Sequence, residues 1–279
     1  MSCLRINIYM QTFSLPRVLG SERLDTVLSL LFSLRDEEVI HVDWSKVQKI
    51  EPAGLAILSI LFDQSIEKKC KLIHENIKPV LKKKYPLILF TDEKFSQLPS
   101  PVLHDFNRPN AFLLCCQGGV DLRYKENLAR SFFNLDEDLL FSVQLVFNEL
   151  IQNAVDHSTS ERYYIYFGLE DDEVHFGVLD MGVSLPAKME QKYNAIDDIN
   201  YLELSLKEGI STRRQRVGGL GLFHTFHMIQ GLKGKFVFIS RDGQIRRYFS
   251  QRKVNRMKLK HRLNGTWVMF TFKNQEQDS

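Results

Sequence analysis

The sequence has few cysteines, and their spacing argues against several kinds of site. The four are Cys3, Cys70, Cys115 and Cys116. None lies in the C-x-x-C spacing of zinc and redox motifs, and adjacent cysteines rarely pair with each other. We therefore expect a reduced protein of the cytoplasm, without a disulfide framework.

Long apolar runs and targeting segments are also lacking. No stretch reaches about 18 uninterrupted apolar residues, the length that a membrane-spanning helix needs. The N-terminal residues lack a long apolar run followed by a small-residue cleavage site, so we expect no secretory signal and no membrane association. The sequence contains neither an internal repeat nor a low-complexity tract.

The net charge is small, and the composition is that of a globular protein. Lys and Arg number 37 against 34 Asp and Glu, a net charge of +3, which argues against non-specific nucleic-acid binding by the whole chain. Hydrophobic residues make up 44% and charged residues 25% of the 279 residues. At roughly 100–200 residues per domain, this length predicts two domains. We assign them to residues 1–98 and 120–275, with a proline-containing linker or edge segment at residues 99–119.

The first hundred residues alternate between strand and helix patterns. Short apolar runs with β-branched residues predict strands at Glu38–Val42 and Lys71–His74. Apolar residues at helical spacing predict helices over Leu55–Ile66 and Ile77–Tyr85, and Pro52-Ala53-Gly54 is a turn signal. This order indicates a small α/β domain.

Residues 10–95 resemble the STAS domain of anti-sigma-factor antagonists. In that family a loop reading Asp-Ser-Ser-Gly precedes a helix, and a partner kinase phosphorylates a serine in it. The matching loop here is Glu51-Pro52-Ala53-Gly54, and neither Pro52 nor Ala53 has a hydroxyl. The usual phosphorylation switch is therefore excluded at this loop. The domain is either a fixed docking module or a unit that only packs against the rest of the chain.

A polar series follows one face of a predicted helix at Leu145–Ser158. Glu149 and Asn153 are four residues apart, and Asp156 follows one turn later, so all three project from the same side. An oxygen-rich face of this kind suits Mg²⁺, which borrows further ligands from phosphates. The alternative is an ordinary polar helix face.

A carboxylate follows the next predicted strand. Val174, Phe176 and Val178 alternate with other residues as on a strand, and Asp180-Met181-Gly182 comes directly after it. Such a carboxylate can accept a hydrogen bond from the exocyclic amine of a base, while a glycine lets the ring approach. The alternative is a turn in which Asp180 caps its own backbone.

A glycine-rich segment opens a later helix. Gly218, Gly219 and Gly221 lead directly into an apolar periodic stretch, and exposed N–H groups at a helix start attract anions. No Gly-Lys-Ser/Thr follows, so this is not a Walker loop. We interpret His224 and His227 as partly buried structural residues rather than metal ligands.

Together, in this order, the three motifs resemble the N box and the two glycine boxes of the GHKL ATPase superfamily. The resemblance covers residues 120–273, and Gly265-Thr266 before the strand-like WVMFTF matches a Gly-Thr pair that precedes that family's last strand. It implies a GHKL (Bergerat-type) α/β sandwich, so that the whole chain belongs to the α/β (α+β) class.

The resemblance also implies a role for each matching residue. It makes Asn153 the Mg²⁺ ligand and Glu149 the residue that positions or activates the attacking nucleophile. The resemblance assigns adenine recognition to Asp180, Gly182 and Thr266. The remaining nucleotide-binding positions are Asp156, Gly218, Gly219, Leu220 and Gly221. Ala187–Val217 matches a lid over the nucleotide; its basic residues Lys207, Arg213, Arg214 and Arg216 either neutralise phosphate or belong to a solvated loop.

The function implied is that of a Mg-ATP-binding regulator. The run from Asn153 to His157 and the STAS-like front end are closest to the anti-sigma serine kinases. Slow ATP hydrolysis, Ser/Thr phosphorylation of a partner and a nucleotide-driven conformational switch all stay open. We expect a STAS-type or sigma-factor-type protein partner, with a homodimer also open. The alternative is a nucleic-acid-binding module, because residues 233–262 contain eleven Lys and Arg against a single acid, Asp242.

Overall fold

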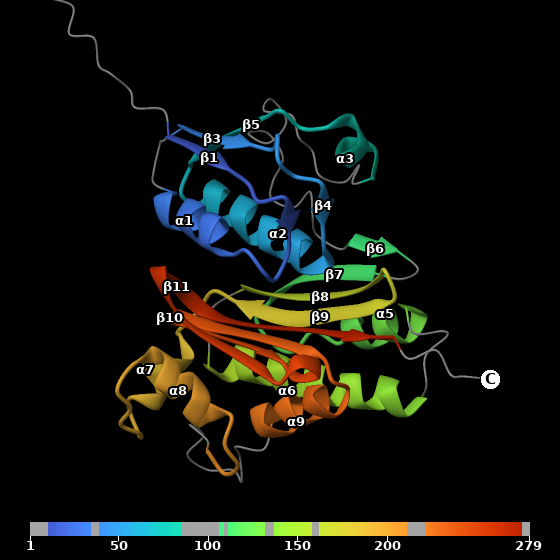
Figure 1. The fold of residues 1–279 in the computed structure, drawn as a ribbon, viewed down its shortest axis with the longest axis vertical. Helices are drawn as coiled ribbons and strands as arrows, with labels where there is room; N and C mark the ends of the chain where they lie inside the picture. Colours follow the sequence, from blue (N-terminus) through green and yellow to red (C-terminus); the bar gives the residue numbers. More distant parts are fainter. Residues whose placement is uncertain are drawn as a thin grey trace, which may run out of the picture.

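The computed structural model describes residues 11–34, 39–84, 106–108, 111–131, 137–157, 162–210 and 221–274 (Figure 1). Helices and strands are mixed throughout, so the α/β prediction is confirmed. Within these ranges no helix is both long and apolar enough to cross a membrane.

The N-terminal part is a small parallel sheet with helices on one face. The sheet has the strand order β1-β3-β5, and β2 pairs with β4 in a second, two-stranded sheet. The strands are β1 (Gln11–Ser14), β2 (Val18–Leu19), β3 (Val39–Asp43), β4 (Lys49–Ile50) and β5 (Lys71–Glu75). The helices are α1 (Asp25–Ser33), α2 (Pro52–Glu67) and α3 (Pro79–Lys84).

One local prediction in this part is wrong. Pro52-Ala53-Gly54 is not a turn ahead of the helix but the first turn of α2 itself. Proline at the first helical position has no N–H to leave unpaired, and its fixed φ suits a helix. The glycine is tolerated because it packs closely, since a Cβ on Gly54 would collide with the backbone of Leu19. In the loop predicted to match the STAS switch, Pro52, Ala53 and Gly54 are thus buried residues of a helix, and Glu51 precedes them as the N-cap.

The C-terminal part is built on one antiparallel sheet with the order β10-β11-β9-β8-β7-β6. Its strands are β6 (Phe106–Arg108), β7 (Ala111–Gln117), β8 (Arg162–Glu170), β9 (Glu173–Asp180), β10 (Lys235–Tyr248) and β11 (Lys253–Lys273). The segment 99–119, predicted as linker or edge, contributes β6 and β7 at one side of this sheet.

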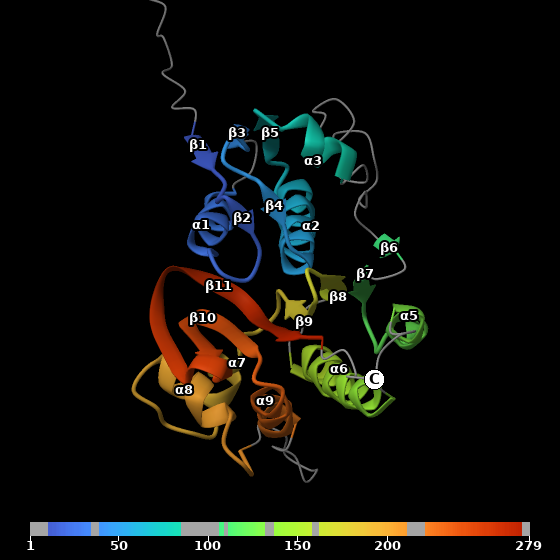
Figure 2. The same cartoon turned by 45° about the vertical axis from the view of Figure 1, so that its right-hand side comes forward.

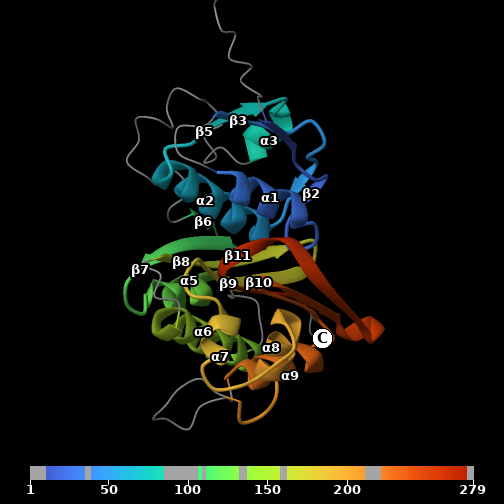
Figure 3. The same ribbon diagram turned by 90° about the vertical axis from the view of Figure 1, so that its left-hand side faces the viewer.

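Helices cover both faces of the large sheet. On one face lie α5 (Arg123–Ser131), α6 (Glu137–His157), α7 (Leu185–Met189), α8 (Asp198–Ser205) and α9 (Gly221–Gly231). On the other face α1 lies over β11, and α2 lies over β8 and β9 (Figures 2 and 3). The molecule therefore has four layers: small sheet, helices, large sheet, helices.

Strand alternation divides the apolar residues of the large sheet between two cores. Phe176 and Phe270 face α6 and α9, whereas Leu179 and Trp267 face α1 and α2. The second of these cores is continuous with the interior of the N-terminal part, which contains Trp44. The two parts thus share a core, and the N-terminal part closes one whole face of the sheet.

The segment predicted as a lid, residues 187–217, is described over about its first three quarters. Up to residue 210 it contains α7 and α8, which pack on β10, with Tyr201 and Leu202 buried. Arg241 of β10 holds this segment in place, because its guanidinium pairs with Glu190 at 2.5 Å and with Asp198 at 3.3 Å. The remainder, residues 211–217, lies outside the described residues.

Candidate functional site

A row of polar side chains crosses four neighbouring strands at one end of the large sheet. The register places Asp180 opposite both Tyr163 and Thr266, and Thr266 opposite Ser240. Asp180 shares a face of β9 with Phe176 and so points toward the helical layer that contains α6 and α9. The Tyr163 hydroxyl is already used, because it donates to the Gly119 carbonyl and accepts from the Asp121 N–H.

Asp180 is a buried carboxylate. Its side chain is 7% exposed and accepts backbone hydrogen bonds from Gly182, at 3.0 Å, and from Thr266. No Lys, Arg or His in the described part of the chain forms an ion pair with it. Burial raises its pKa to about 7, although both backbone hydrogen bonds act against the shift. A perturbed carboxyl of this kind marks a candidate functional site.

The position of Asp180 differs slightly from the prediction. It is the last paired residue of β9 rather than a residue beyond the strand. The bond from the Gly182 N–H is nevertheless the local cap that the alternative reading anticipated. Both features hold the carboxylate still, so the cap and a binding role do not exclude each other.

Two hydroxyls beside Asp180 anchor the start of α7. The N–H of Leu185 donates to Ser240 Oγ at 3.0 Å and to Thr266 Oγ1 at 3.2 Å. Ser240 in turn donates to the Gly265 carbonyl at 2.7 Å. Gly265 has a φ of +100°, and a Cβ there would overlap the carbonyl of Asp180, so only glycine fits. Thr266 therefore has a structural role whatever it contacts in a ligand.

The sequence reasoning missed Ser240. Its signal was available, because Ser240 follows Phe236 and Phe238 on the same strand face and is the first polar residue of that series. What the sequence did not supply was the pairing of β10 with β11, which brings Ser240 next to Thr266.

The second group of predicted residues lies where α6 meets α9. The Glu149 side chain lies directly against Gly221, so that any Cβ at Gly221 would overlap its carboxyl group. Asn153 and Asp156 follow on the same face of α6. Asn153 is half-buried, and the exposed Asp156 accepts a hydrogen bond from Gln152 at 2.5 Å. Glu149 of α6 and Gly221 at the start of α9 are thus in contact.

Topology brings the two groups to the same end of the sheet. The segment between His157 of α6 and Arg162 of β8 spans at most about 18 Å, and Arg162 lies beside Tyr163, the partner of Asp180. The start of α9 is fixed near this end by Gly221 against Glu149. In Figure 1, β9 points toward the side where α7 and α8 lie.

Several predicted residues lie outside the described part of the chain. These are Gly218, Gly219 and Leu220, together with Arg213, Arg214 and Arg216. Lys207 is described and is exposed. Among the described residues there is no cluster of three His, Cys, Asp or Glu side chains that could hold a metal ion by itself.

The prediction for the two histidines of α9 is wrong. His224 and His227 are exposed, not partly buried. The buried face of α9 is formed instead by Thr225, Phe226 and Ile229. Phe223 packs edge-on against both imidazoles, with ring centroids 5.4 Å and 4.3 Å away.

Most charges of the basic segment 233–262 have partners inside the molecule. Glu22 near α1 pairs with Lys235 at 3.1 Å and with Arg246 at 3.5 Å. Glu203 and Asp198 of α8 form ion pairs with other basic residues of the segment. The basic residues in ion pairs are Lys235, Arg241, Arg246, Arg247, Arg256, Lys258 and Arg262. Charges neutralised in this way contribute less to phosphate binding, and the segment instead fastens the hairpin to α8 and to the N-terminal part.

The loop that matches the STAS switch is sealed against the large sheet. Pro52 is buried on Gly168 of β8, where a Cβ would overlap its ring. Glu51 is also largely buried, and this burial raises its pKa even though Lys235 and Lys49 act in the opposite direction. The N-terminal part therefore packs against the large sheet through the start of α2.

No family model matches the chain, and no curated protein sequence matches it.

Proposed function

We propose that this chain is a cytoplasmic, ATP-binding regulator with a GHKL-type nucleotide domain and an N-terminal STAS-like domain. The nucleotide lies at the end of the sheet, between Asp180 and the junction of α6 with α9. Adenine is read by Asp180, with Gly182 beside the ring. Its phosphates lie at Gly221, which opens α9. Gly218, Gly219 and Leu220, which precede Gly221 in the sequence and lie outside the described residues, would complete this phosphate site.

The observation that carries this proposal is the buried Asp180, which has no cationic partner among the described residues. An ionised carboxylate in such a place is costly unless a ligand donates to it. An exocyclic amine supplies that donor, and it favours the ionised form of the side chain. The donor set therefore fits an adenine better than it fits an anion or a metal.

Glu149, Asn153 and Gly221 fit the phosphate end of the same ligand. Gly221 leaves room for Glu149 at the start of a helix, where backbone N–H groups favour anions. The carboxamide of Asn153 offers Mg²⁺ one oxygen, and the phosphates would supply others. Bound Mg²⁺ would neutralise phosphate charge, and Glu149 would accept a proton from the attacking hydroxyl or water. Asp156 lies one turn further, at the solvent edge.

The regulatory part of the proposal follows from the N-terminal domain. Its switch loop lacks a hydroxyl and is buried on the face of the sheet opposite α6. Phosphoryl transfer within the chain is thus excluded at this loop. The natural target is a separate protein of the STAS or sigma-factor type, toward which the chain acts as a serine kinase or as a slow ATPase switch.

Calorimetric titration tests the adenine pocket. ATP with Mg²⁺ is titrated into the native protein and into Asp180→Asn, and we expect at least tenfold weaker binding in the variant because the amide cannot act as an anionic acceptor. Asp172→Asn is the matched control, because it makes the same chemical change in the turn between β8 and β9, at the opposite end of β9 from Asp180. Asp172 is exposed, and its φ of +59° suits asparagine. Equal affinity in all three proteins, or no heat in any, overturns the proposal.

A further inference from the structure

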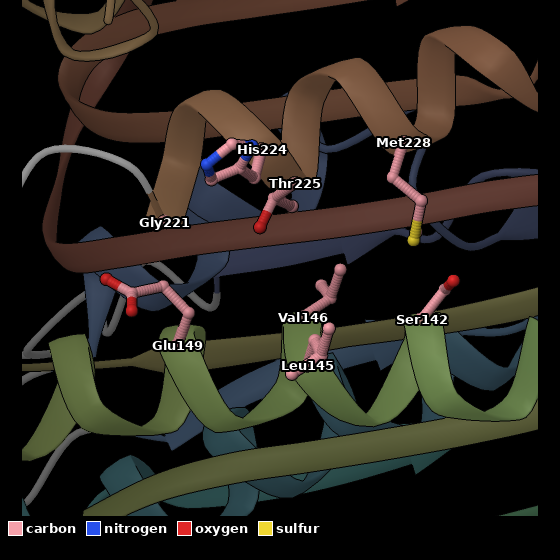
Figure 4. A pocket seen from close by; sticks show the side chains of 8 residues that line it. All are labelled: Ser142, Leu145, Val146, Glu149, Gly221, His224, Thr225 and Met228. Carbon is pink, nitrogen blue, oxygen red and sulfur yellow. The ribbon is translucent and has the colours of Figure 1, made fainter. Parts of the chain in front are cut away.

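A cavity of about 330 Å³ lies between α6 and α9 (Figure 4). Its lining is mostly apolar, with a few polar groups at the edges, which is typical of pockets that bind organic groups. The lining residues are Ser142, Leu145, Val146, Glu149, Gly221, His224, Thr225 and Met228. The two helices run in opposite directions along it, so that Gly221 lies across from Glu149 and Met228 from Ser142.

One end of the cavity coincides with the proposed phosphate site. Glu149 and Gly221, which contact each other, form that end. A group held in the cavity therefore lies directly beside the carboxylate that would receive the proton of an attacking hydroxyl. The apolar part of such a group extends along α6, away from the nucleotide.

The apolar surface continues out of the cavity to solvent. Leu145 in the lining is 52% exposed, and Phe141, one turn earlier on α6, is 61% exposed. Beyond Phe141 the first turn of α6 carries the exposed acids Glu137 and Asp138. An exposed apolar strip that ends in charge is characteristic of a surface that binds another protein rather than of an enclosed small-molecule site.

From this geometry we propose that the α6–α9 cavity holds a large apolar side chain of a separate protein, and thereby places a Ser or Thr hydroxyl of that protein beside Glu149. The inference rests on the proposed function and names its acceptor. Glu149 takes the hydroxyl proton while the hydroxyl oxygen bonds to the γ-phosphorus of ATP. The bond from that phosphorus to the bridging oxygen breaks, and ADP leaves.

The dimensions of α6 fix the order of side chains in the acceptor. At 1.5 Å per residue, the part of the cavity from Leu145 to Ser142 lies about 6–10 Å from Glu149 along the helix, and Glu137 and Asp138 lie about 17 Å away. An extended peptide advances about 3.3 Å per residue. The apolar side chain is therefore expected two or three residues from the acceptor hydroxyl. A Lys or Arg is expected about five residues from it, opposite the acids.

A library of peptides with a fixed serine and degenerate flanks tests this inference. The full-length protein, labelled ATP and Mg²⁺ are used, and phosphate incorporation is measured. We expect enrichment of Leu, Met or Phe two or three residues from the serine and of Lys or Arg at about five. Leu145→Glu should reduce incorporation at least tenfold while ATP affinity, measured by calorimetry, is unchanged. Val80→Glu on α3, where the valine is 64% exposed, is the control and should have no effect.

The outcomes separate this inference from the proposed function. ATP binding without peptide phosphorylation, or phosphorylation without apolar preference, overturns the inference alone. It is also overturned if Leu145→Glu leaves incorporation unchanged, or if that variant converts a dimer of this chain into monomers, because the face then belongs to a second copy. Absence of ATP binding overturns both.

Discussion

Asp180 shows how one residue can report on a site before any ligand is bound. Its strand alternates apolar residues toward the helical layer, and the same alternation turns the carboxylate inward. There it accepts hydrogen bonds from two backbone N–H groups, and no cation of the described ranges pairs with it. The desolvation that raises its pKa to about 7 is a cost that the folded protein carries whenever the group is ionised.

This cost makes stability depend on pH in a defined direction. The pKa of Asp180 is about 7 in the folded state and 3.8 when unperturbed, so the folded state binds more protons between these values. The free energy of unfolding therefore falls as pH rises from 4 to 7, by at most about 4 kcal/mol from this group. Asp180→Asn removes the dependence. In urea unfolding we expect the free energy of unfolding of the variant to exceed that of the native protein most at pH 8. This difference should become smaller toward pH 4. A gain that does not change with pH contradicts this assignment.

At the scale of elements, the contact between α6 and α9 is set by a single missing side chain. Gly221 begins α9, and Glu149 occupies the space that a Cβ would need. The sequence predicted the helix, its glycine-rich start and the polar face of α6. It could not predict that Glu149 turns toward Gly221, because this depends on how α6, which lies on β9, packs against α9, which lies on β10.

A double-mutant cycle measures this contact. Gly221→Ala should destabilise the native protein by about 1–3 kcal/mol, since the added methyl group must displace Glu149 or the start of α9. In a Glu149→Ala background the same change should be neutral or slightly stabilising, because the overlap is gone and alanine favours helix. Urea unfolding of the four proteins gives the interaction free energy between Gly221 and Glu149. Additive effects would mean that the two residues do not touch.

The elements also show where local reasoning misled. Pro52-Ala53-Gly54 has the composition of a turn, yet it opens α2 because a proline at the first helical position and close packing of the glycine both suit a helix. For the two histidines of α9, helical spacing alone did not tell which face is buried. Tertiary packing decided both cases.

At the scale of the whole molecule, the two parts of the chain form one cooperative unit. The helices α1 and α2 cover a face of the large sheet, and their core is continuous with it. Polar contacts, one buried and one exposed, add to this interface. The Tyr164 hydroxyl donates to Asp63 at 2.6 Å in its buried part, and Arg162 pairs with Glu67 at 3.0 Å at its exposed edge. Separation of the parts would expose this core and remove the Tyr164 hydroxyl from Asp63.

The two tryptophans allow a direct test of this unity. Trp44 lies in the N-terminal part and Trp267 in β11, and both are fully buried. In Trp44→Phe and Trp267→Phe variants, the remaining fluorescence signal should change at the same urea concentration as the far-UV circular dichroism. Adding Tyr164→Phe should lower both urea midpoints and reduce the free energy of unfolding by about 1–3 kcal/mol, because the buried Asp63 carboxylate loses the hydrogen bond from Tyr164. A Trp44 transition at lower urea than the dichroism would show independent domains.

Side-chain pattern alone predicted the elements that carry the candidate site: a polar-faced helix at α6, a strand followed directly by Asp180, and glycines ahead of α9. These depend on side-chain periodicity and backbone preference, which act over a few residues and can be read locally. Only the tertiary structure decided that Ser240 and Thr266 jointly anchor α7, that Pro52 is sealed against Gly168, and that the basic hairpin is neutralised by Glu22 and α8. Each joins segments far apart in the chain, and such contacts form only when layers pack to exclude water from a shared core.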